Sequence, residues 1–287
     1  MFRLVEESRS GYYRHLKTVD NQQHTVRIVI REVQGIRIKQ PRIGTRKLYY
    51  LLKSRFKQIG LKVGRDRLFT ILRANNLLVK KRKKYTKTTN SKHWLKKHKN
   101  KILGKKITRP EEVFVSDITY IETAQGYQYL NLVTDAYSKK IMGFHLSNNL
   151  KTEGCIKALK MAIRQRIYQK PLIHHSDRGV QYCSDNYQKL LKKNNIKCSM
   201  TENYDPYQNA IAERVNGILK DEFFEDVYFS SFAIAQKVIQ EAISIYNYQR
   251  PHWSNQLLTP QQMHLQSQLT PKSWKKKPPK NKSLEIL

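Results

Sequence analysis

The stretch EEVFVSDITYIET, residues 111–123, is the segment on which the fold of this chain depends. Its Val, Phe, Ile, Thr and Tyr residues predict a β-strand. Asp117 lies in the middle of that strand among apolar neighbours. Because the chain is strongly basic overall, an acid in this position needs an explanation, either as a paired core residue or as part of a functional site.

The segments that follow the first strand alternate between strand and helix patterns. Three consecutive strands and then alternating helices and strands predict an α/β fold whose sheet begins with an antiparallel meander. After the first strand and an AQGY turn, the expected strands are 128–137, 140–148, 170–177 and 196–200, and the expected helices are 152–168, 184–195, 206–224 and 232–249.

Residues 24–78 predict a small all-α region. Apolar residues recur at helical spacing in HTVRIVIREV (24–33), GTRKLYYLLKSRF (44–56) and VGRDRLFTILRANNLL (63–78). A short turn with two glycines precedes the last helix, which Arg65 and Arg67 open. This order is compatible with a helix-turn-helix that reads the major groove of DNA. A small helical bundle with a solvated basic face fits the same pattern, and the two alternatives stay open.

The charge of the chain indicates a polyanionic partner. It contains 55 Lys and Arg against 22 Asp and Glu, a net charge of +33, with an isoelectric point near 10.1. Such a balance is typical of nucleic-acid-binding proteins. Residues 79–106 hold thirteen Lys and Arg and no acid, which predicts a linker that follows phosphates rather than one that only adds solubility. The candidate contacts there are Lys81, Arg82, Lys83, Tyr85 and Trp94.

Other classes of protein are disfavoured by the sequence. No apolar run approaches the ~18 residues of a membrane span, and residues 1–16 lack the apolar segment of a secretory signal. The three cysteines follow no metal or disulfide motif, which favours free thiols in a reducing compartment. We therefore expect a cytoplasmic protein with no membrane partner.

Three carboxylates carry the functional hypothesis. Asp117 is in the first strand, Asp177 ends the strand PLIHHSD, and Glu213 lies in the helix NAIAERVNGILK. Taken singly, they could be a paired core acid, a turn residue and an exposed helix residue. Fifty-nine residues separate the first two acids and thirty-five separate the second two. Lys220 follows Glu213 by seven positions, which places both on one face of a continuous helix.

This arrangement resembles the signature of the transposase and retroviral-integrase superfamily. The flanking words SDITYI (116–121), HSDRGVQY (175–182) and YDPYQNAIAERVNGILKDEF (204–223) resemble the catalytic blocks of bacterial insertion-sequence transposases, above all the second-reading-frame proteins of insertion sequence family three. SRSGYYRHL (8–16) is similar to that family's first segment. The sequence departs from the family at Phe114 and Ser116, one of which is often Trp, and at Val180, which is often Ser.

The resemblance implies a division of the chain and a fold for each part. We expect an RNase H-like integrase catalytic core, with a mixed five-stranded sheet and flanking helices, behind a small all-α domain. The expected segments are an N-terminal segment 1–23, a helix-turn-helix-like DNA-binding domain 24–78, a basic linker 79–107, the catalytic core 108–265 and a basic disordered tail 266–287.

The resemblance also implies the chemistry, which is metal-dependent cleavage and rejoining of DNA. Asp117, Asp177 and Glu213 would bind two Mg²⁺ ions, with Mn²⁺ as a possible substitute and Asp117 shared between them. Water would first free a 3′-OH at the end of the element, and that hydroxyl would then attack another phosphodiester. Gly179 would let the backbone turn clear of the DNA, and His175 is either a partner of a ligand carboxylate or a core residue.

The remaining expectations concern DNA and protein partners. Lys220, Arg178 and Asn209 are candidate DNA contacts, together with Arg65 and Arg67. The resemblance implies double-stranded DNA at the element ends and at the target, a homo-oligomer on DNA, and a helix-turn-helix and leucine-zipper protein from the first reading frame, or a fusion to it. It also implies a bacterial protein that joins the nucleoid when bound to DNA.

Two alternatives to a transposase remain. One is a nuclease of the same fold that cuts without joining, against which the spacing of thirty-five residues, Lys220 and the flanking words argue. The other is a non-catalytic DNA-binding regulator derived from a transposase. A protein that only binds DNA has no need of three intact acids, so the catalytic reading is preferred.

Overall fold

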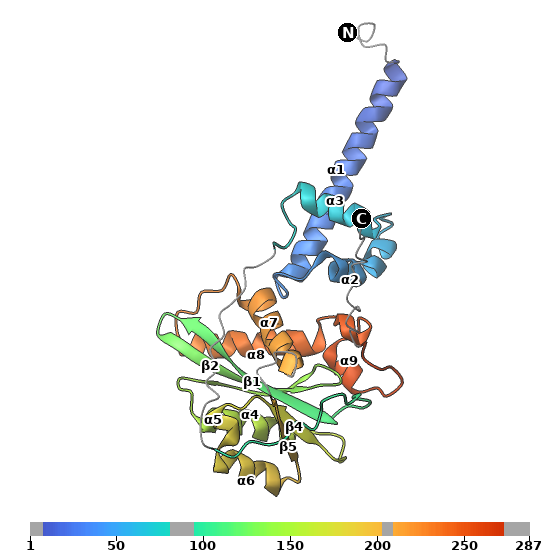
Figure 1. Ribbon diagram of the computed structural model, residues 1–287. Coiled ribbons are helices and arrows are strands. Elements are labelled where there is room, and N and C mark those ends of the chain that lie inside the picture. Colours follow the sequence, from blue (N-terminus) through green and yellow to red (C-terminus); the bar gives the residue numbers. More distant parts are fainter. Residues whose placement is uncertain (1–7, 81–94, 203–208, 273–287) are drawn as a thin grey trace, which may run out of the picture.

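The computed structural model describes residues 8–80, 95–202 and 209–272. A helical region made by α1 (Arg9–Arg37), α2 (Thr45–Gln58) and α3 (Arg65–Ala74) stands on a larger core, where helices cover both faces of one sheet (Figure 1). The observed order of strands and helices confirms the predicted α/β core preceded by helices.

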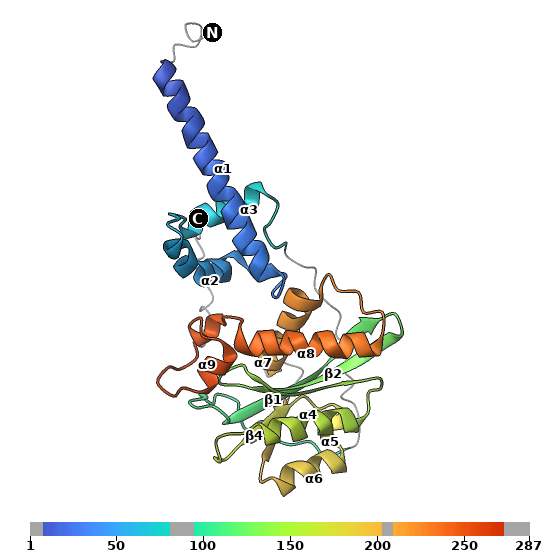
Figure 2. The ribbon, with the colours of Figure 1, turned by 180° about the vertical axis from the view of Figure 1, so that it is seen from behind.

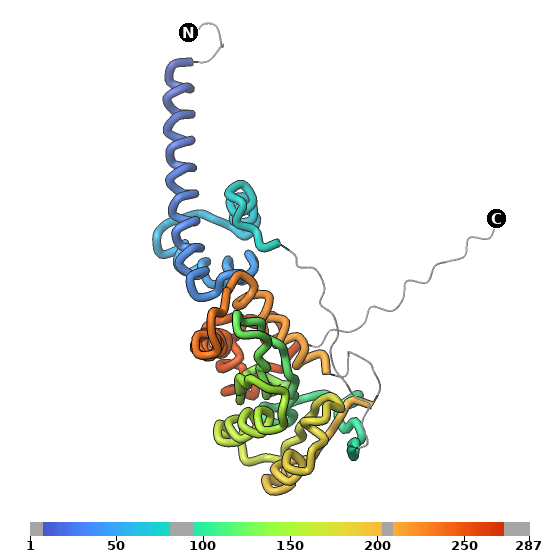
Figure 3. Tube along the Cα trace, turned by 90° about the vertical axis from the view of Figure 1, so that its left-hand side faces the viewer, coloured from blue at the N-terminus to red at the C-terminus, as the bar shows by residue number. Residues whose placement is uncertain are grey.

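The helical region has its own hydrophobic core. Val33 of α1, Leu48 of α2 and Leu68 of α3 are all fully buried within it. The first part of α1 extends away from the rest of the chain (Figure 3), and Val29 and Val33 are its buried residues. The expected boundary between residues 23 and 24 falls inside this helix. Residues Ile59 to Gly64 separate α2 from α3.

The sheet contains five strands in the order β3-β2-β1-β4-β5. Its first three strands form the expected meander, because β1 pairs antiparallel with β2 and β2 pairs antiparallel with β3. The other two strands pair in parallel, β1 with β4 and β4 with β5. The bounds are β1 (Val113–Thr123), β2 (Gly126–Asp135), β3 (Ile141–Ser147), β4 (Ile173–Ser176) and β5 (Lys197–Met200).

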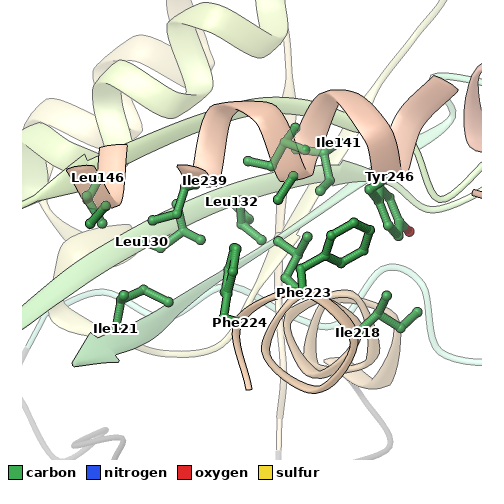
Figure 4. Close-up of a cluster of buried hydrophobic side chains, with 14 of the residues drawn as sticks. Ile121, Leu130, Leu132, Ile141, Leu146, Ile218, Phe223, Phe224, Ile239 and Tyr246 are labelled. Carbon is green, nitrogen blue, oxygen red and sulfur yellow. The ribbon is translucent and has the colours of Figure 1, made fainter. Parts of the chain in front are cut away.

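Helices cover both faces of this sheet (Figure 2). One face packs against α4 (Thr152–Arg164), α5 (Val180–Cys183) and α6 (Asp185–Lys193). The other packs against α7 (Ala210–Ile218), a π-helix η3 (Leu219–Phe224) and α8 (Phe232–Tyr248), where Leu130 and Leu132 meet Phe223 and Ile239 (Figure 4). The short α9 (Pro260–His264) follows the 3₁₀ turn η4 (Trp253–Asn255). A strand covered on both sides has few exposed positions, which explains the long apolar run of β1.

Two glycines let α4 approach the sheet closely. A Cβ on Gly143 of β3 would lie 2.1 Å from the carbonyl oxygen of Ala158. A Cβ on Gly154 of α4 would lie 2.4 Å from Oγ of Ser147. Since neither backbone position leaves room for a side chain, α4 is set directly against β3 at these two points.

The helical region joins the core at Glu222 of η3. The Glu222 carbonyl accepts a hydrogen bond from the backbone N–H of Arg42, at 3.2 Å. Its carboxylate lies 3.1 Å from Nζ of Lys47 on α2 and accepts two hydrogen bonds from Arg250, whose side chain is 2% exposed. One half-buried carboxylate therefore holds a cation from each side of the junction.

Part of the predicted linker also lies on the core. The backbone N–H of Lys101 donates to Oγ of Ser199 on β5 at 2.8 Å, and that of Asn100 donates to Glu202 at 2.8 Å. Residues 81–94 of the linker, with Lys81, Arg82, Lys83, Tyr85 and Trp94, lie outside the described residues, as does the tail beyond Lys272. Among the described helices, none is long and apolar enough to cross a membrane.

A buried ionic cluster attaches α9 to the sheet. His264 lies 3.3 Å from Asp135 at the end of β2 and 3.4 Å from Glu111, which also pairs with Arg166 at 3.0 Å. Asp135 accepts hydrogen bonds from the N–H groups of Glu111 and Ser138, so its carboxylate holds the turn that follows β2. Burial alone would lower the pKa of His264, but its bonds to Asp135 and Glu111 outweigh burial and raise it.

This raised pKa predicts a pH-dependent contribution to stability. Protonated His264 stabilises the fold fully below the ordinary histidine pKa, and the contribution disappears as pH rises through the higher folded-state pKa. His264→Gln should therefore lower the free energy of unfolding by about 1–3 kcal/mol near pH 5.5, and by progressively less toward pH 8.5. Urea unfolding across this range measures the difference. Exposed His15→Gln is the control, and a pH-independent deficit in the His264 variant would contradict the prediction.

Candidate active site

The pairing of β1 with β4 determines where two of the predicted acids lie. Val113 pairs with Ile173 and Val115 with His175, a constant offset of sixty residues. Continuing that register by two residues sets Asp117 opposite Asp177, just beyond the end of β4 at Ser176. In a parallel pair, residues in register point to the same face. The fifty-nine residues between the two acids in the sequence thus correspond to the pairing register of β1 and β4.

Asp117 is held by hydrogen bonds to both of its carboxylate oxygens. Oδ1 accepts from the backbone N–H of Ile118 at 2.9 Å, and Oδ2 accepts from Nδ2 of Asn216 on α7 at 2.9 Å. Burial, followed by the negative charges of Asp177 and Glu213, raises the pKa of Asp117 to about 7, against the opposing effect of these two bonds. The carboxylate is therefore close to a protonation equilibrium at neutral pH.

Asp177 begins the turn that follows β4. Its Oδ1 accepts a hydrogen bond from the backbone N–H of Gly179 at 3.0 Å. A Cβ on Gly179 would lie 3.1 Å from that oxygen and 3.2 Å from Oε1 of Gln181. The φ angle of Gly179 is −62°, which any residue can adopt. Gly179 therefore leaves space beside the Asp177 carboxylate, and its backbone angle does not itself require glycine.

Glu213 lies in the first turn of α7 and is exposed. Asn209, the N-cap of α7, and Asn216 within the helix bond to β1, at the Ser116 carbonyl and the Asp117 carboxylate. Residues 209, 213 and 216 share one face of the helix because they are spaced by four and three. That face directs Glu213 toward the two aspartates, close enough for its charge to raise the pKa of Asp117.

The three carboxylates are the type of ligand that binds a divalent cation, but their side chains are not grouped around a common point. Carboxylate oxygens are the donors that Mg²⁺ prefers, and after burial the negative charges of Asp177 and Glu213 help to raise the pKa of Asp117. Within the residues that the structure describes, no three His, Cys, Asp or Glu side chains are grouped tightly enough to hold a metal ion.

The predicted DNA contacts near the acids have varied surroundings. Arg178 is half-buried beside Asp177. Asn209 is buried, and its amide donates to the Ser116 carbonyl at 3.1 Å, so we reassign it from contacting DNA to holding α7 on β1. Lys220 lies in the π-helix η3. The predicted position of Lys220 on the same helix face as Glu213 assumed an unbroken α-helix, and the π-helical winding interrupts it. Arg65 and Arg67 are exposed at the start of α3, where Arg65 pairs with Asp66.

The two histidines before Asp177 are core residues. His174 lies with Nε2 2.8 Å from Oγ of Ser116 and 2.9 Å from the hydroxyl of Tyr187. Burial lowers the pKa of His174 to about 3, so the ring is neutral. His175 is also fully buried, with Nδ1 2.9 Å from Oγ of Ser199. This supports the core interpretation of His175 and shows how β4 is fixed between β1 and β5.

Sequence reasoning missed Asn216, which is the side-chain partner of Asp117. The available signal was its position three residues after Glu213 in NAIAERVNGILK, on the helix face assigned to the site. An Asn there is also a common exposed helix residue, and its hydrogen bond crosses from α7 to β1. The sequence alone gave no reason to select it.

Comparison with known proteins identifies the family to which the chain belongs. Residues 107–206 match the integrase core domain family, and residues 194–260 match a second integrase core domain family. The chain is 36% identical over 258 residues to the insertion element IS600 uncharacterized 31 kDa protein of Shigella sonnei, covering 88% of this chain and 93% of that protein. The chain belongs to the IS3-type insertion-sequence transposases, which have an integrase core. DNA transposition and integration are the functions of that family, as predicted.

Further relatives of this transposase agree over shorter lengths. It is 35% identical over 144 residues to transposase InsF for insertion sequence IS3A of Escherichia coli, half of each chain. It is 34% identical over 148 residues to the transposase for insertion sequence element IS904 of Lactococcus lactis, covering 51% of this chain and 58% of that one. The simian T-cell lymphotropic virus intasome in complex with PP2A regulatory subunit B56 gamma contains a chain with a TM-score of 0.50 and 17% identity. The match covers 82% of this chain and 75% of that one, which confirms the fold.

The carboxylate cluster of the transposase predicts that a neutral substitute stabilises the metal-free protein. Because the folded-state pKa of Asp117 is raised, its stabilising contribution is present in acid and is lost as pH rises through about 7. Asp117→Asn should then be more stable than the wild type at pH 8, on the order of 2–4 kcal/mol, with the difference vanishing toward acid. Urea unfolding in EDTA measures this. Glu241→Gln on exposed α8 is the control, and a less stable Asp117→Asn protein at pH 8 would refute the coupling.

Proposed function

We propose that this transposase cuts DNA at the ends of its insertion sequence and joins the new ends to other DNA, with Asp117, Asp177 and Glu213 as the catalytic carboxylates. The observation that carries the proposal is the register of β1 and β4, which, continued by two residues, sets Asp117 opposite Asp177. The rise in the pKa of Asp117 caused by Asp177 and Glu213 supports grouping all three.

The metal requirement follows from the donor chemistry. Asp117 would be shared by two Mg²⁺ ions, or by Mn²⁺ in their place, while Asp177 and Glu213 would each bind one. When bound, the ions supply charge neutralisation and activation of oxygen at the reacting phosphate. The hydrogen bonds from Asn216 and Gly179 keep one oxygen each of Asp117 and Asp177 in a fixed direction, so that the acids do not have to be ordered at the moment of reaction.

The reaction consists of two displacements at phosphorus. In the first, the oxygen of water attacks the phosphodiester at the element end, and the 3′ oxygen leaves as a hydroxyl. In the second, that 3′-OH attacks another phosphodiester, a new phosphorus–oxygen bond forms, and the displaced 3′ oxygen takes up the proton. No side chain becomes covalently attached to DNA.

The DNA and protein partners are part of the same proposal. Lys220 and Arg178 would contact phosphates near the acids, while Arg65 and Arg67, in a helix-turn-helix, and the basic linker would contact DNA farther away. The protein would act as a homo-oligomer on DNA, with a first-reading-frame protein or fusion supplying end recognition. Its DNA substrate would place it in the bacterial cytoplasm, on the nucleoid.

Loss of any of the three carboxylates should abolish transposition. Asp117→Asn, Asp177→Asn and Glu213→Gln each remove a proposed ligand, and several kcal/mol of transition-state stabilisation correspond to a drop of about a thousandfold or more. The measurements are the transposition frequency of an intact element carrying each variant, and Mg²⁺-dependent cleavage of its own end DNA. DNA binding by the variants should be unchanged or slightly stronger.

Asp185→Asn, an exposed acid at the start of α6, is the matched control and should transpose normally. If the three variants cut and join as well as the wild type, the catalytic assignment is wrong. If the wild type binds its element ends but does not cut them with Mg²⁺ or Mn²⁺, the protein is a regulator and the proposal fails.

Asn216 should act as a positioning residue for Asp117. Asn216→Ala removes the donor to Oδ2 and should lower the cleavage rate by about 10–100-fold, the usual effect of losing a group that orients a metal ligand. It should also raise the Mg²⁺ concentration needed for half-maximal cleavage. A titration of cleavage rate with Mg²⁺ measures both. Exposed Asn148→Ala is the control, and an unchanged Mg²⁺ dependence with a reduced rate would indicate a merely structural role.

A further inference from the structure

A cleft of about 710 Å³ lies where the helical region meets the core, separate from the three carboxylates. The helix α7 forms part of its wall with Ile211, Arg214 and Ile218. Asn209 and Asn216 extend from other positions of the same helix to β1 and Asp117. Other lining residues come from the start of α2, in the helical region, and from η4, in the core. One helix thus connects this cleft to the proposed active site.

The charge of the cleft is one-sided. Eight of its lining residues are Lys or Arg, and none is Asp or Glu. Some of these cations are neutralised, since Lys47 and Arg250 pair with Glu222 and Lys105 lies 2.9 Å from Glu112. Others are exposed and form no ion pair with the described residues, namely Arg46, Lys106, Arg214 and Lys272. A concave surface of this kind attracts an anion with several charges.

The cleft also presents an aromatic ring on a fixed support. Trp253 is 45% exposed and lines the cleft. It belongs to η4, whose Asn255 is fully buried and donates to the Ser138 carbonyl at 2.6 Å. The backbone N–H of Lys272 donates to the Ser254 carbonyl at 2.8 Å, which holds the same turn from the other side. The remaining wall includes Phe69 of α3, Ile107 and aliphatic residues of α7.

Positive charge beside an accessible aromatic ring and aliphatic groups fits a nucleotide with an exposed base. Phosphates match the cations, and a base matches the ring, because proteins bind single strands by combining a basic groove with aromatic stacking. The volume lies within the ~300–1,000 Å³ of sites for small molecules. It takes one or two nucleotides, whereas a duplex, with its bases stacked inside, cannot present one to Trp253.

We propose that this cleft binds one or two unpaired nucleotides of a DNA strand, with the base on Trp253 and the phosphates on Arg46, Lys106 and Arg214. The inference rests on the proposed function only in taking DNA as the ligand, because the cleft contains none of the three carboxylates. It gives the protein a place to hold a strand that is separated from its complement, on the helix that carries Glu213.

A fluorescent single strand tests the proposal without cleavage. The probe is an oligothymidylate of about ten nucleotides with one 2-aminopurine, mixed with the full chain in EDTA. Wild type should quench the fluorescence through stacking. Trp253→Ala should weaken binding about tenfold or more, the effect of losing the stacking of a single base. Trp253→Phe keeps a ring and should bind within about threefold of wild type.

The controls separate the cleft from other aromatic and basic surfaces. Tyr228→Ala removes a ring that is 78% exposed elsewhere and should bind like wild type. A blunt duplex with 2-aminopurine paired inside it should bind equally well to wild type and Trp253→Ala. The proposal is overturned if folded Trp253→Ala binds the single strand like wild type, or if Trp253→Ala weakens duplex and single strand equally.

Salt dependence gives a second readout that does not depend on the ring. The slope of log affinity against log salt is about −0.7 per phosphate neutralised on a single strand. Arg46→Gln with Lys106→Gln should therefore flatten the slope by about 1.4, whereas Lys189→Gln with Lys192→Gln on exposed α6 should leave it unchanged. Equal slopes for the two double variants would refute the cleft. Because no step requires catalysis, the result stands whether or not Asp117, Asp177 and Glu213 are the catalytic acids.

Discussion

The parallel pairing of β1 with β4 is the constraint on which the rest of the site depends. Continued by two residues beyond the last pair, its offset of sixty residues sets Asp117 opposite Asp177, whose charge raises the pKa of Asp117. Two carboxylates facing each other there repel, and β4 ends at Ser176, one residue before its acid. The buried contacts of His174 and His175 with Ser116 and Ser199 fix the register in the adjoining residues. These buried hydrogen bonds therefore support an arrangement that the charges oppose.

The helix α7 connects the different functional parts of the molecule. Asn209 and Asn216 bind it to β1, and Glu213 stands between them on the same face. Other positions on α7 line the basic cleft. The segment continues into η3, whose Glu222 holds Lys47 of the helical region and the buried Arg250. The helical region is thus linked to the segment that carries α7 through the half-buried carboxylate of Glu222.

The differences between expectation and structure have local physical reasons. The helix α1 begins at Arg9, ahead of the expected helical region. The prediction missed this first part because its mainly polar residues show little apolar periodicity. Lys220 departs from its expected helical repeat because π-helical winding begins at Leu219, which spacing along a sequence does not reveal. Asn209 looked like a DNA contact because it lies near Glu213 in the sequence. Its burial against Ser116 depends on how α7 packs on β1.

By itself the sequence determined the strand and helix order, the basic character and the three candidate acids. The order and the charge follow from apolar periodicity and composition, whereas the three acids were selected because their spacing and flanking words resemble a known family. Only the tertiary structure decided the sixty-residue register of β1 and β4, the hydrogen bond from Asn216 to Asp117, and the basic cleft beside Trp253. Each of these joins segments tens or hundreds of residues apart. They depend on burial and charge at the point of contact, and no local pattern in the sequence records either quantity.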